Sequence, residues 1–272
     1  MNTDRIVKIA LDLAGMSTLP TDSGIWVPGD EIGRVLFGMD LGVAELDLAQ
    51  RRGYDLALAH HPPEATIEAW RVYLDHIDQM VDAGVPREEA EAAVMQEIEA
   101  MQLGAHARNY DHTISFARLL GIPFVNLHQP LDEIGRQRLQ ERVDALQDHN
   151  SDATVGDVLR TLMGFPEVDG AAMAPFIAVG AAGAPAGRVV VAHGALDVPN
   201  YDMLDAYFRH GVGTVVVLRV SSSNLARLRA EQLGHLIVLG HNAGDSLGFT
   251  PFLAALAEEG LEVTAASGVI PG

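Results

Sequence analysis

The feature that most constrains the fold of this chain is an internal repeat. His128 and His241 are 113 residues apart, and in both copies an aspartate follows four residues later, as Asp132 and as Asp245. Each copy begins with Leu-Gly, passes through a short apolar segment that predicts a buried strand, and continues into a helical pattern. A long sequence period of this kind indicates that a structural unit has been duplicated. The chain is therefore expected to contain two similar halves.

The segments before the repeat also correspond, although more loosely. Arg34 and Arg188 each open a series that reads strand, helix, strand. This order predicts parallel strands joined by right-handed crossovers. The expected fold class is therefore α/β, with one half in residues 1–150 and the other in 151–272, packed about a pseudo-twofold axis. Residues 261–264 read as a last strand that closes the sheet.

Three stretches depart from this strand and helix pattern. Residues 64–110 are rich in alanine and carboxylates with a helical period, so they predict an added helical segment in the first half, which Gly84 and Pro86 divide in two. Residues 17–29 are interpreted as a loop because glycine and proline punctuate them. The Gly/Ala/Pro-rich region from 164 to 187 receives no element.

The first half carries a histidine pair at the end of a predicted strand. Residues 56–59 form a short apolar run, which is typical of an interior strand, and Pro62 and Pro63 end it. His60 and His61 therefore lie at the carboxyl end of a strand, where open α/β sheets collect their ligands. Because histidine is the commonest metal ligand, this position indicates a metal site.

The composition narrows the chemistry. The chain has no cysteine and a single lysine, Lys8, which excludes thiolate chemistry and argues against a lysine Schiff base or a phosphate-loop lysine. A metal would have only nitrogen and oxygen ligands, which suits zinc, manganese or iron. The net charge of −19 argues against nucleic-acid binding. Neither a membrane span nor a signal peptide is evident, so we expect a soluble, cytoplasmic protein.

Duplication would bring three strand ends into one cleft. Their nitrogen and oxygen ligands would suffice for two metal coordination spheres, with an aspartate as the bridge. The candidate groups at these ends are His60 with His61, His128 with Asp132, and His241 with Asp245.

Structural roles compete with this interpretation. His128 could hydrogen-bond to a carboxylate and orient it instead of binding metal. Asp132 and Asp245 could each cap a helix. In the second half, Arg219 and the serines Ser221–Ser223 stand where the first half has its histidine pair. One metal site shared by the two halves is therefore expected, instead of a separate site in each half.

These motifs together resemble the Nif-three-like family, also known as GTP cyclohydrolase I type 2-like. The resemblance rests on the His-His-Pro turn, on the His-Xaa-Xaa-Leu-Asp segment ending at Asp132, and on the late Gly-His-Xaa-Xaa-Xaa-acid motif followed by Gly248. The loop from Asp22 to Gly29 is similar to an N-terminal loop of that family, and Asp40 stands where the family has an aspartate after its first strand.

The resemblance implies a two-repeat fold with a dinuclear centre of divalent metal ions, commonly assembled as a hexameric ring. Asp245 would be the bridging carboxylate, where the family usually has glutamate, and His128 would lie behind the ligands. The metal ligands that the resemblance implies are His60, His61, Asp132, His241 and Asp245.

The function expected from these observations is metal-dependent hydrolysis of a nucleotide or another phosphoester, with opening of a purine ring, as in GTP cyclohydrolase, as a narrower version. Glu64 or His128 would relay the proton in this reaction. The alternative is a non-catalytic metal-binding or regulatory scaffold, for which the long acidic helices would be the partner surface.

Overall fold

The structure, a computed structural model, describes residues 1–272. The chain forms two compact units, and each draws on several stretches of sequence. The first unit comprises Met1–Val72, Met101–Ile134 and Gly248–Val269, and the second comprises Tyr73–Ala100, Gly135–Leu247 and Ile270–Gly272. The division predicted at residue 150 concerns the sequence repeat, and it stays a prediction.

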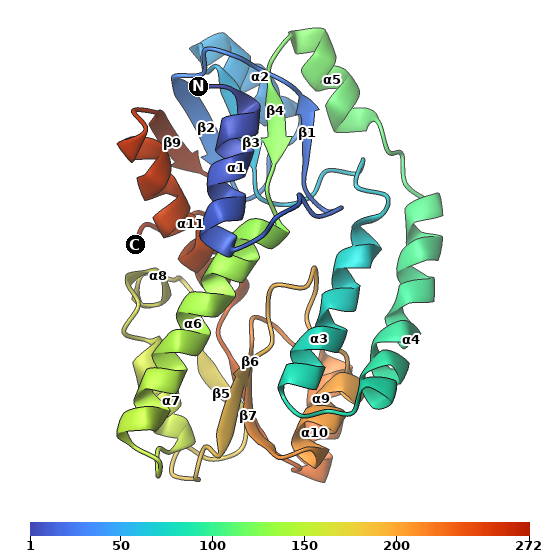
Figure 1. Ribbon diagram of the computed structural model, residues 1–272, viewed down its shortest axis with the longest axis vertical. Helices are drawn as coiled ribbons and strands as arrows, with labels where there is room; N and C mark the ends of the chain where they lie inside the picture. The colour runs from blue at the N-terminus through green and yellow to red at the C-terminus, as the bar shows by residue number, and fades with distance from the viewer. The chain divides into compact units, whose positions relative to one another are not determined.

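Each unit contains one sheet (Figure 1). The four strands of the second sheet have the same order as four of the five strands of the first. The first sheet runs β1 (Gly24–Val27), β4 (Phe124–Asn126), β3 (Leu56–Ala59), β2 (Arg34–Gly38), β9 (Glu262–Ala266). The second runs β5 (Phe176–Val179), β8 (His235–Val238), β7 (Val212–Val217), β6 (Arg188–Val191). Only β1 and β5 are antiparallel to their neighbours. The predicted α/β class with two similar halves is thus confirmed.

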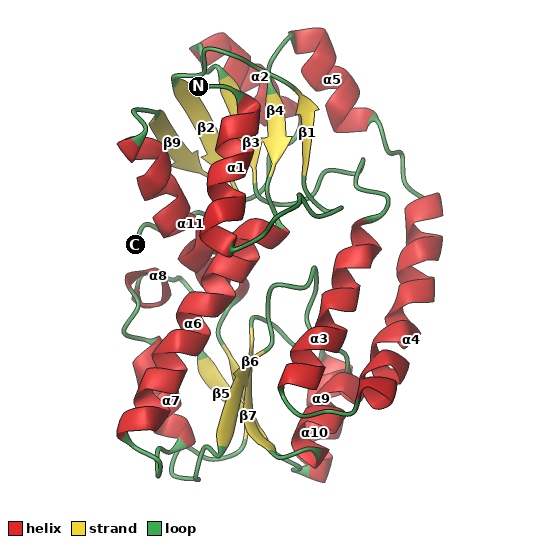
Figure 2. Ribbon diagram, viewed as in Figure 1, coloured by secondary structure: helices red, strands yellow, loops and turns green.

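Helices surround both sheets (Figure 2). Those within the first unit are α1 (Thr3–Ala14), α2 (Val43–Arg52) and α5 (His112–Leu120). Those within the second unit are α3 (Asp75–Asp82), α7 (Val155–Leu162), α8 (Pro166–Asp169), α9 (Tyr201–Arg209) and α10 (Ser222–Glu231). The unit boundary falls within the 3₁₀ helix Ala69–Leu74 and within α4 (Arg87–His106), α6 (Gln129–His149) and α11 (His241–Glu258). None of the helices is both long enough and apolar enough to cross a membrane.

The first sheet is buried on both faces, and alternate residues of each strand supply the two cores. Phe37 of β2 and Leu58 of β3 pack in one core with α1 and the C-terminal part of α11. Leu36 and Ala57 pack in the other with α2 and α5. Parallel strands covered by helices on both faces read as continuous apolar runs, which is why β3 was readable from sequence.

The second unit has its own core. Val191 of β6, Val216 of β7 and Ile237 of β8 face α6 and α7, whose residues Leu139 and Val158 are fully buried against them. Helix α9 packs on β7. The strand ends of each unit are therefore held by a packed core of that unit.

Three expectations from the sequence need correction. The stretch 17–29, interpreted as a loop, contains β1, and the unassigned region before Gly187 contains β5. Residues 262–266 do form a strand, β9, but it pairs with β2 in the first unit's sheet. The predicted helical segment 64–110 does contain two helices, α3 and α4, separated near Gly84 and Pro86. However, α3 and most of α4 belong to the second compact unit and not to the first, because their contacts lie mainly there.

Candidate metal centre

The hydrogen bonds between β2 and β3 fix the backbone of the histidine pair. They continue past the end of β3, since the amides of His60 and His61 donate to the carbonyl oxygens of Gly38 and Met39, each at 2.9 Å. His60 is fully buried, whereas the side chain of His61 is 23% exposed. Both imidazoles are therefore held at the predicted strand end, one inside the unit and one at its surface.

The end of β4 supplies the next two groups. His128 follows β4, its amide donates to Ser23 Oγ at 2.9 Å, and Asp132 lies one turn later in α6. The Asp132 amide donates to the carbonyl oxygen of His128 at 3.1 Å, so the two side chains share one face of the first helical turn. Both residues are buried.

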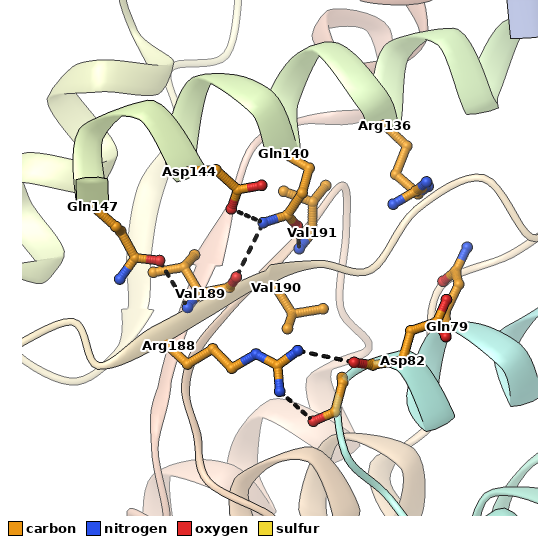
Figure 3. Close-up of a pocket in the computed structure, with 11 residues that line it drawn as sticks. Gln79, Asp82, Arg136, Gln140, Asp144, Gln147, Arg188, Val189, Val190 and Val191 are labelled. Carbon is orange, nitrogen blue, oxygen red and sulfur yellow. Dashed lines mark hydrogen bonds between the residues drawn. The ribbon is translucent and has the colours of Figure 1, made fainter. Parts of the chain in front are cut away.

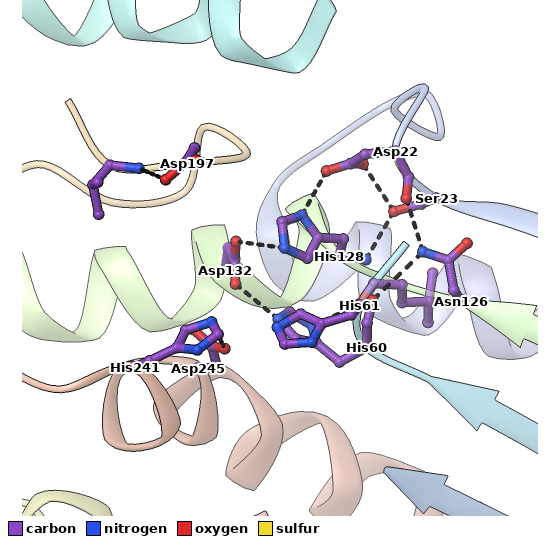
Figure 4. A network of polar contacts seen from close by, with 12 residues as sticks. Asp22, Ser23, His60, His61, Asn126, His128, Asp132, Asp197, His241 and Asp245 are labelled. Atoms are coloured by element: carbon purple, nitrogen blue, oxygen red, sulfur yellow. Dashed lines mark hydrogen bonds and ion pairs between the residues drawn. The ribbon is translucent and has the colours of Figure 1, made fainter. Parts of the chain in front are cut away.

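These side chains form a compact cluster within the first unit (Figure 4). His60 Nε2 lies 3.3 Å from Asp132 Oδ1, and His128 Nε2 lies 3.6 Å from Asp132 Oδ2. Ligand atoms of His60, His61 and His128 all lie within 4.8 Å of one another. The structure therefore brings together four of the residues that the sequence singled out.

Each imidazole of the cluster uses its Nδ1 on a hydrogen-bond acceptor. His60 Nδ1 donates to the carbonyl oxygen of Leu127 at 3.0 Å. His61 Nδ1 contacts Asp40 Oδ1 at 2.7 Å, and His128 Nδ1 contacts Asp22 Oδ2 at 2.8 Å. An acceptor at Nδ1 fixes the proton there and leaves the lone pair of a neutral imidazole on Nε2. All three rings are thus set to coordinate through Nε2.

Burial and the neighbouring carboxylates have opposite effects on the pKa of His128. Burial disfavours the imidazolium, but the Asp132 charge and the hydrogen bond to Asp22 outweigh it. The pKa of His128 therefore lies above its ordinary value. Asp22 is itself fully buried and also accepts from Ser23 Oγ at 3.1 Å, so its orientation is fixed.

The second unit contains the other copy of the motif. His241 begins α11, and its Nε2 lies 3.0 Å from Asp245 Oδ2, the carboxylate being 2% exposed and the imidazole 41%. Where the first unit has its histidine pair, Arg219 follows β7 and forms an ion pair with Asp197 at 2.7 Å. The predicted His-Asp pair is present here, and its joint use with the first unit's cluster stays a prediction.

Glu64 follows the His-His-Pro-Pro turn and has a partner at the start of a helix. Its carboxylate accepts a hydrogen bond from the amide of Thr113, in the first turn of α5. This contact gives Glu64 a structural role as a helix cap. Its predicted role in proton transfer stays a prediction.

This chain is similar to a protein of known structure over almost its whole length. The chain is 40% identical to a NIF3 superfamily protein from Sphaerobacter thermophilus, with 98% of each chain covered and a TM-score of 0.94. This chain belongs to the NIF3 superfamily. The resemblance noted in the sequence motifs is thereby confirmed.

More distant structures share the fold of this NIF3 protein. HcgD from Methanocaldococcus jannaschii is 13% identical over 97% of both chains, with a TM-score of 0.58. Protein SA1388 from Staphylococcus aureus is 12% identical, covers 98% of this chain and 96% of its own, and has a TM-score of 0.53. No family model matches the chain, and no curated protein matches it.

The nitrogen and oxygen donors of the cluster in this chain fit a divalent cation. His60 and His128, when neutral, direct Nε2 lone pairs toward the oxygens of Asp132. Lone pairs facing a carboxylate repel it unless a proton or a cation lies between them. Imidazole nitrogen with carboxylate oxygen is a donor set that suits zinc, manganese and iron.

Two residues that support the cluster, Asp22 and Asp40, received no role from the sequence. Asp40 follows β2 in the chain and holds His61, while Asp22 holds His128 from the loop before β1. The family resemblance included both residues, Asp22 at the start of its N-terminal loop and Asp40 after its first strand, but it gave neither a hydrogen-bond partner. The position of Asp40 at a strand end beside the predicted histidine strand could have indicated its contact with His61.

Proposed function

We propose that this protein binds divalent metal ions at the first unit's His-Asp cluster and uses them to hydrolyse a nucleotide or another phosphoester. The observation that carries the proposal is the common orientation of three imidazoles. Each has its Nδ1 on an acceptor, and two direct Nε2 to the buried carboxylate of Asp132. Hydrogen bonds of this kind fix and strengthen metal-ligating histidines.

The proposed ligands follow the repeat. His60, His61 and Asp132 belong to the first unit, and the second copy of the motif would add His241 and Asp245. Five nitrogen and oxygen ligands would serve two ions of zinc, manganese or iron, with Asp245 as the bridge. Support for the second pair is the 113-residue repeat and its own short His-Asp contact.

A bound divalent ion would polarise a phosphoryl oxygen and lower the pKa of a coordinated water. His128 would hold the proton that the leaving group needs, because Asp22 orients its ring and its Nε2 faces the proposed metal ligand Asp132. Glu64 is the alternative proton carrier. Opening of a purine ring, as in a GTP cyclohydrolase, would use the same residues.

A non-catalytic metal-binding role is the second candidate, and burial of the cluster favours it. His60 is fully buried, and Asp132 and His128 are 4% and 6% exposed. A centre closed to solvent by protein ligands is typical of structural metal sites, whereas catalytic sites keep a position open. His61 is the cluster's most exposed ligand candidate at 23%, so any substrate would approach on its side.

The test is metal content per chain, followed by hydrolysis. The wild type, His61→Ala and Asp132→Asn are each loaded with zinc or manganese, dialysed and analysed by elemental analysis, with the exposed His149→Ala as the matched control. We expect the first two variants to lose metal and the control to retain it. Hydrolysis of a panel of nucleotides and phosphoesters, with GTP included for ring opening, then separates the two functions.

The outcomes are distinct. A wild type that retains no metal would contradict both functions. Metal retention with no hydrolysis above the level of Asp132→Asn would support the non-catalytic scaffold. We also propose that the protein is a homo-oligomer, a hexameric ring in the version that the family resemblance implies. Light scattering after size exclusion tests the ring, since a monomer mass would contradict it.

A further inference from the structure

The two sheets differ at one edge. In the first unit β2 has β9 on its outer side, paired in parallel from Arg34 opposite Glu262 to Gly38 opposite Ala266. In the second unit β6 is the equivalent strand, and it is the edge of its sheet. The second unit therefore has no strand where the first unit has β9.

Two glutamine side chains of α6 form hydrogen bonds with the backbone N–H and C=O groups of this edge (Figure 3). Gln140 accepts from the amide of Val191 at 2.9 Å and donates to the carbonyl of Val189 at 3.2 Å. Gln147 accepts from the amide of Val189 at 3.3 Å and donates to the carbonyl of Gly187 at 2.6 Å. A primary amide offers the same donor and acceptor as a peptide group. The two side chains thus stand in for peptide groups of a neighbouring strand.

The arginines at the start of β2 and β6, Arg34 and Arg188, differ in one respect, because only Arg34 has an acidic partner on a neighbouring strand. Arg34 Nη1 donates to two carbonyl oxygens at the C-terminal end of α2, at 3.0 and 2.8 Å, and its Nε lies 3.7 Å from the Glu262 carboxylate of β9. Arg188 likewise donates to two carbonyl oxygens at the C-terminal end of α3, at 2.8 and 2.9 Å. No carboxylate pairs with Arg188. The two guanidinium groups are held alike, but only the first has its acidic strand partner.

Space is available beside this edge. A cavity of about 290 Å³ lies against β6, α6 and the end of α3. Polar groups predominate in its wall, together with the side chain of Val190. The residues that line it include Gln79, Arg136, Gln140, Asp144, Arg188 and Val190.

We propose that the outer edge of β6 docks an extended, acidic segment of a partner polypeptide, laid parallel to β6 as β9 is laid on β2. Main-chain hydrogen bonds would supply most of the affinity, as they do wherever a peptide adds a strand to a sheet edge. An acidic residue at the start of the segment would pair with Arg188, in the register that Glu262 has opposite Arg34. Because the peptide exchanges its hydrogen bonds for those of the two glutamines, the affinity is expected to be modest.

A peptide with the sequence of β9 is a suitable probe for binding at the edge of β6. A terminally blocked peptide, Leu-Glu-Val-Thr-Ala-Ala, copies residues 261–266, and the control peptide has lysine in place of its glutamate. Fluorescence anisotropy of the labelled peptides measures binding, and hydrogen exchange measures protection of residues 187–192. We expect the acidic peptide to bind the full chain, to raise protection at these residues, and to bind at least fivefold more tightly than the lysine peptide.

Variants locate the site. Arg188→Gln should weaken the acidic peptide to the level of the lysine peptide, whereas Arg160→Gln, an exposed arginine of α7 in the same unit, should leave it unchanged. The double variant Gln140→Ala/Gln147→Ala removes the competing amides, so it should bind the peptide about tenfold more tightly. Tighter peptide binding by this variant could not result from unfolding, because an unfolded second unit would no longer present the edge of β6 to the peptide.

Three outcomes would overturn the proposal. The first is no binding of the acidic peptide by the wild type or by the double glutamine variant at millimolar concentration. The second is binding that the lysine peptide and Arg188→Gln leave unchanged. The third is an assembly of the double glutamine variant, without peptide, that is larger than the wild-type assembly, which would assign the edge to a second copy of this chain.

Discussion

Both units have a basic side chain at the same position after a central strand, with different chemistry. In the first, His61 after β3 contacts Asp40 after β2 at 2.7 Å. In the second, Arg219 after β7 contacts Asp197, in the longer segment that follows β6, also at 2.7 Å. A basic side chain at a strand end therefore contacts an aspartate in both units, although the two aspartates are not at equivalent positions.

The type of side chain at the position of His61 and Arg219 determines what this strand end can bind. An imidazole that donates through Nδ1 keeps a lone pair on Nε2, whereas a guanidinium has donors only and stays charged. The first unit can thus coordinate a cation at this position, and the second can only repel one. Both units therefore have a contact between a basic side chain and an aspartate, but only the first unit has a nitrogen lone pair at this position.

The largest effect is expected from the carboxylate of the His-Asp motif. Asp132→Asn removes the charge that His60 and His128 face, so bound metal should fall to background in elemental analysis. Asp245→Asn makes the same change in the second copy. Equal losses would support joint use of both copies, and retention of metal by Asp245→Asn would show that the first unit binds metal without it.

The second prediction converts one strand end into the other. His61→Arg can keep an ion pair with Asp40, as Arg219 does with Asp197, but it offers no lone pair. Metal affinity should fall about 100-fold, with the midpoint of thermal unfolding of the metal-free protein nearly unchanged. Isothermal titration with zinc measures the first quantity. Unchanged zinc affinity would remove His61 from the ligand set.

A smaller effect is expected from the aspartate behind a ligating imidazole. Asp40→Asn can donate an amide hydrogen to His61 Nδ1 and so move the ring proton to Nε2, the atom proposed to bind metal. Zinc affinity should fall about 10- to 100-fold. Nitrogen NMR shifts of the His61 ring would report the tautomer directly, and an unchanged tautomer with reduced affinity would contradict this explanation.

The smallest effects concern acid stability and also differ between the units. Hydrogen bonds from the amides of Arg34 and Gly33 lower the pKa of Asp55 in the first unit, and a hydrogen bond from His210 lowers the pKa of Glu89 in the second. A lowered carboxyl pKa stabilises the fold above the unfolded value, and this contribution disappears as the pH falls below about 4.

Urea unfolding at pH 7 and pH 3 measures this difference. At pH 7, Asp55→Asn should cost about 1 kcal/mol, because two backbone amides lose a charged acceptor. Glu89→Gln should cost about 0.5 kcal/mol, since the pair that it breaks is partly exposed. Both costs should shrink at pH 3. A cost of Asp55→Asn that is the same at both pH values would contradict the role of its charge.

Strands buried on both faces were predictable from sequence, and the two antiparallel edge strands were not. β3 and β7 are continuous apolar runs because helices cover both faces of the sheet. β1 and β5, the antiparallel edges, are short and adjoin glycine or proline, so their local pattern is that of a loop. The placement of β9 in the first sheet depends on long-range pairing, which no local pattern encodes.

The candidate site was predictable where ligands sit at strand ends. His60, His61, His128 and Asp132 were identified in this way, and the first unit brings them together. Their hydrogen-bond partners were harder to find, because Asp22 reaches His128 from 106 residues away in sequence. The backbone contacts that fix His60 and His128 depend on the folded ladder, and sequence spacing does not reveal them.

The pairing of β9 with β2 has a consequence for how the protein is made. The sheet of the first unit pairs residues 34–38 with residues 262–266, so the ribosome makes the whole second-unit sheet between these two neighbouring strands. Domains usually fold as they emerge, N-terminal parts first. Here the outer side of β2 stays uncovered until residues 262–266 have been made. A chaperone that shields the nascent chain would therefore find a long-lived target at this side of β2.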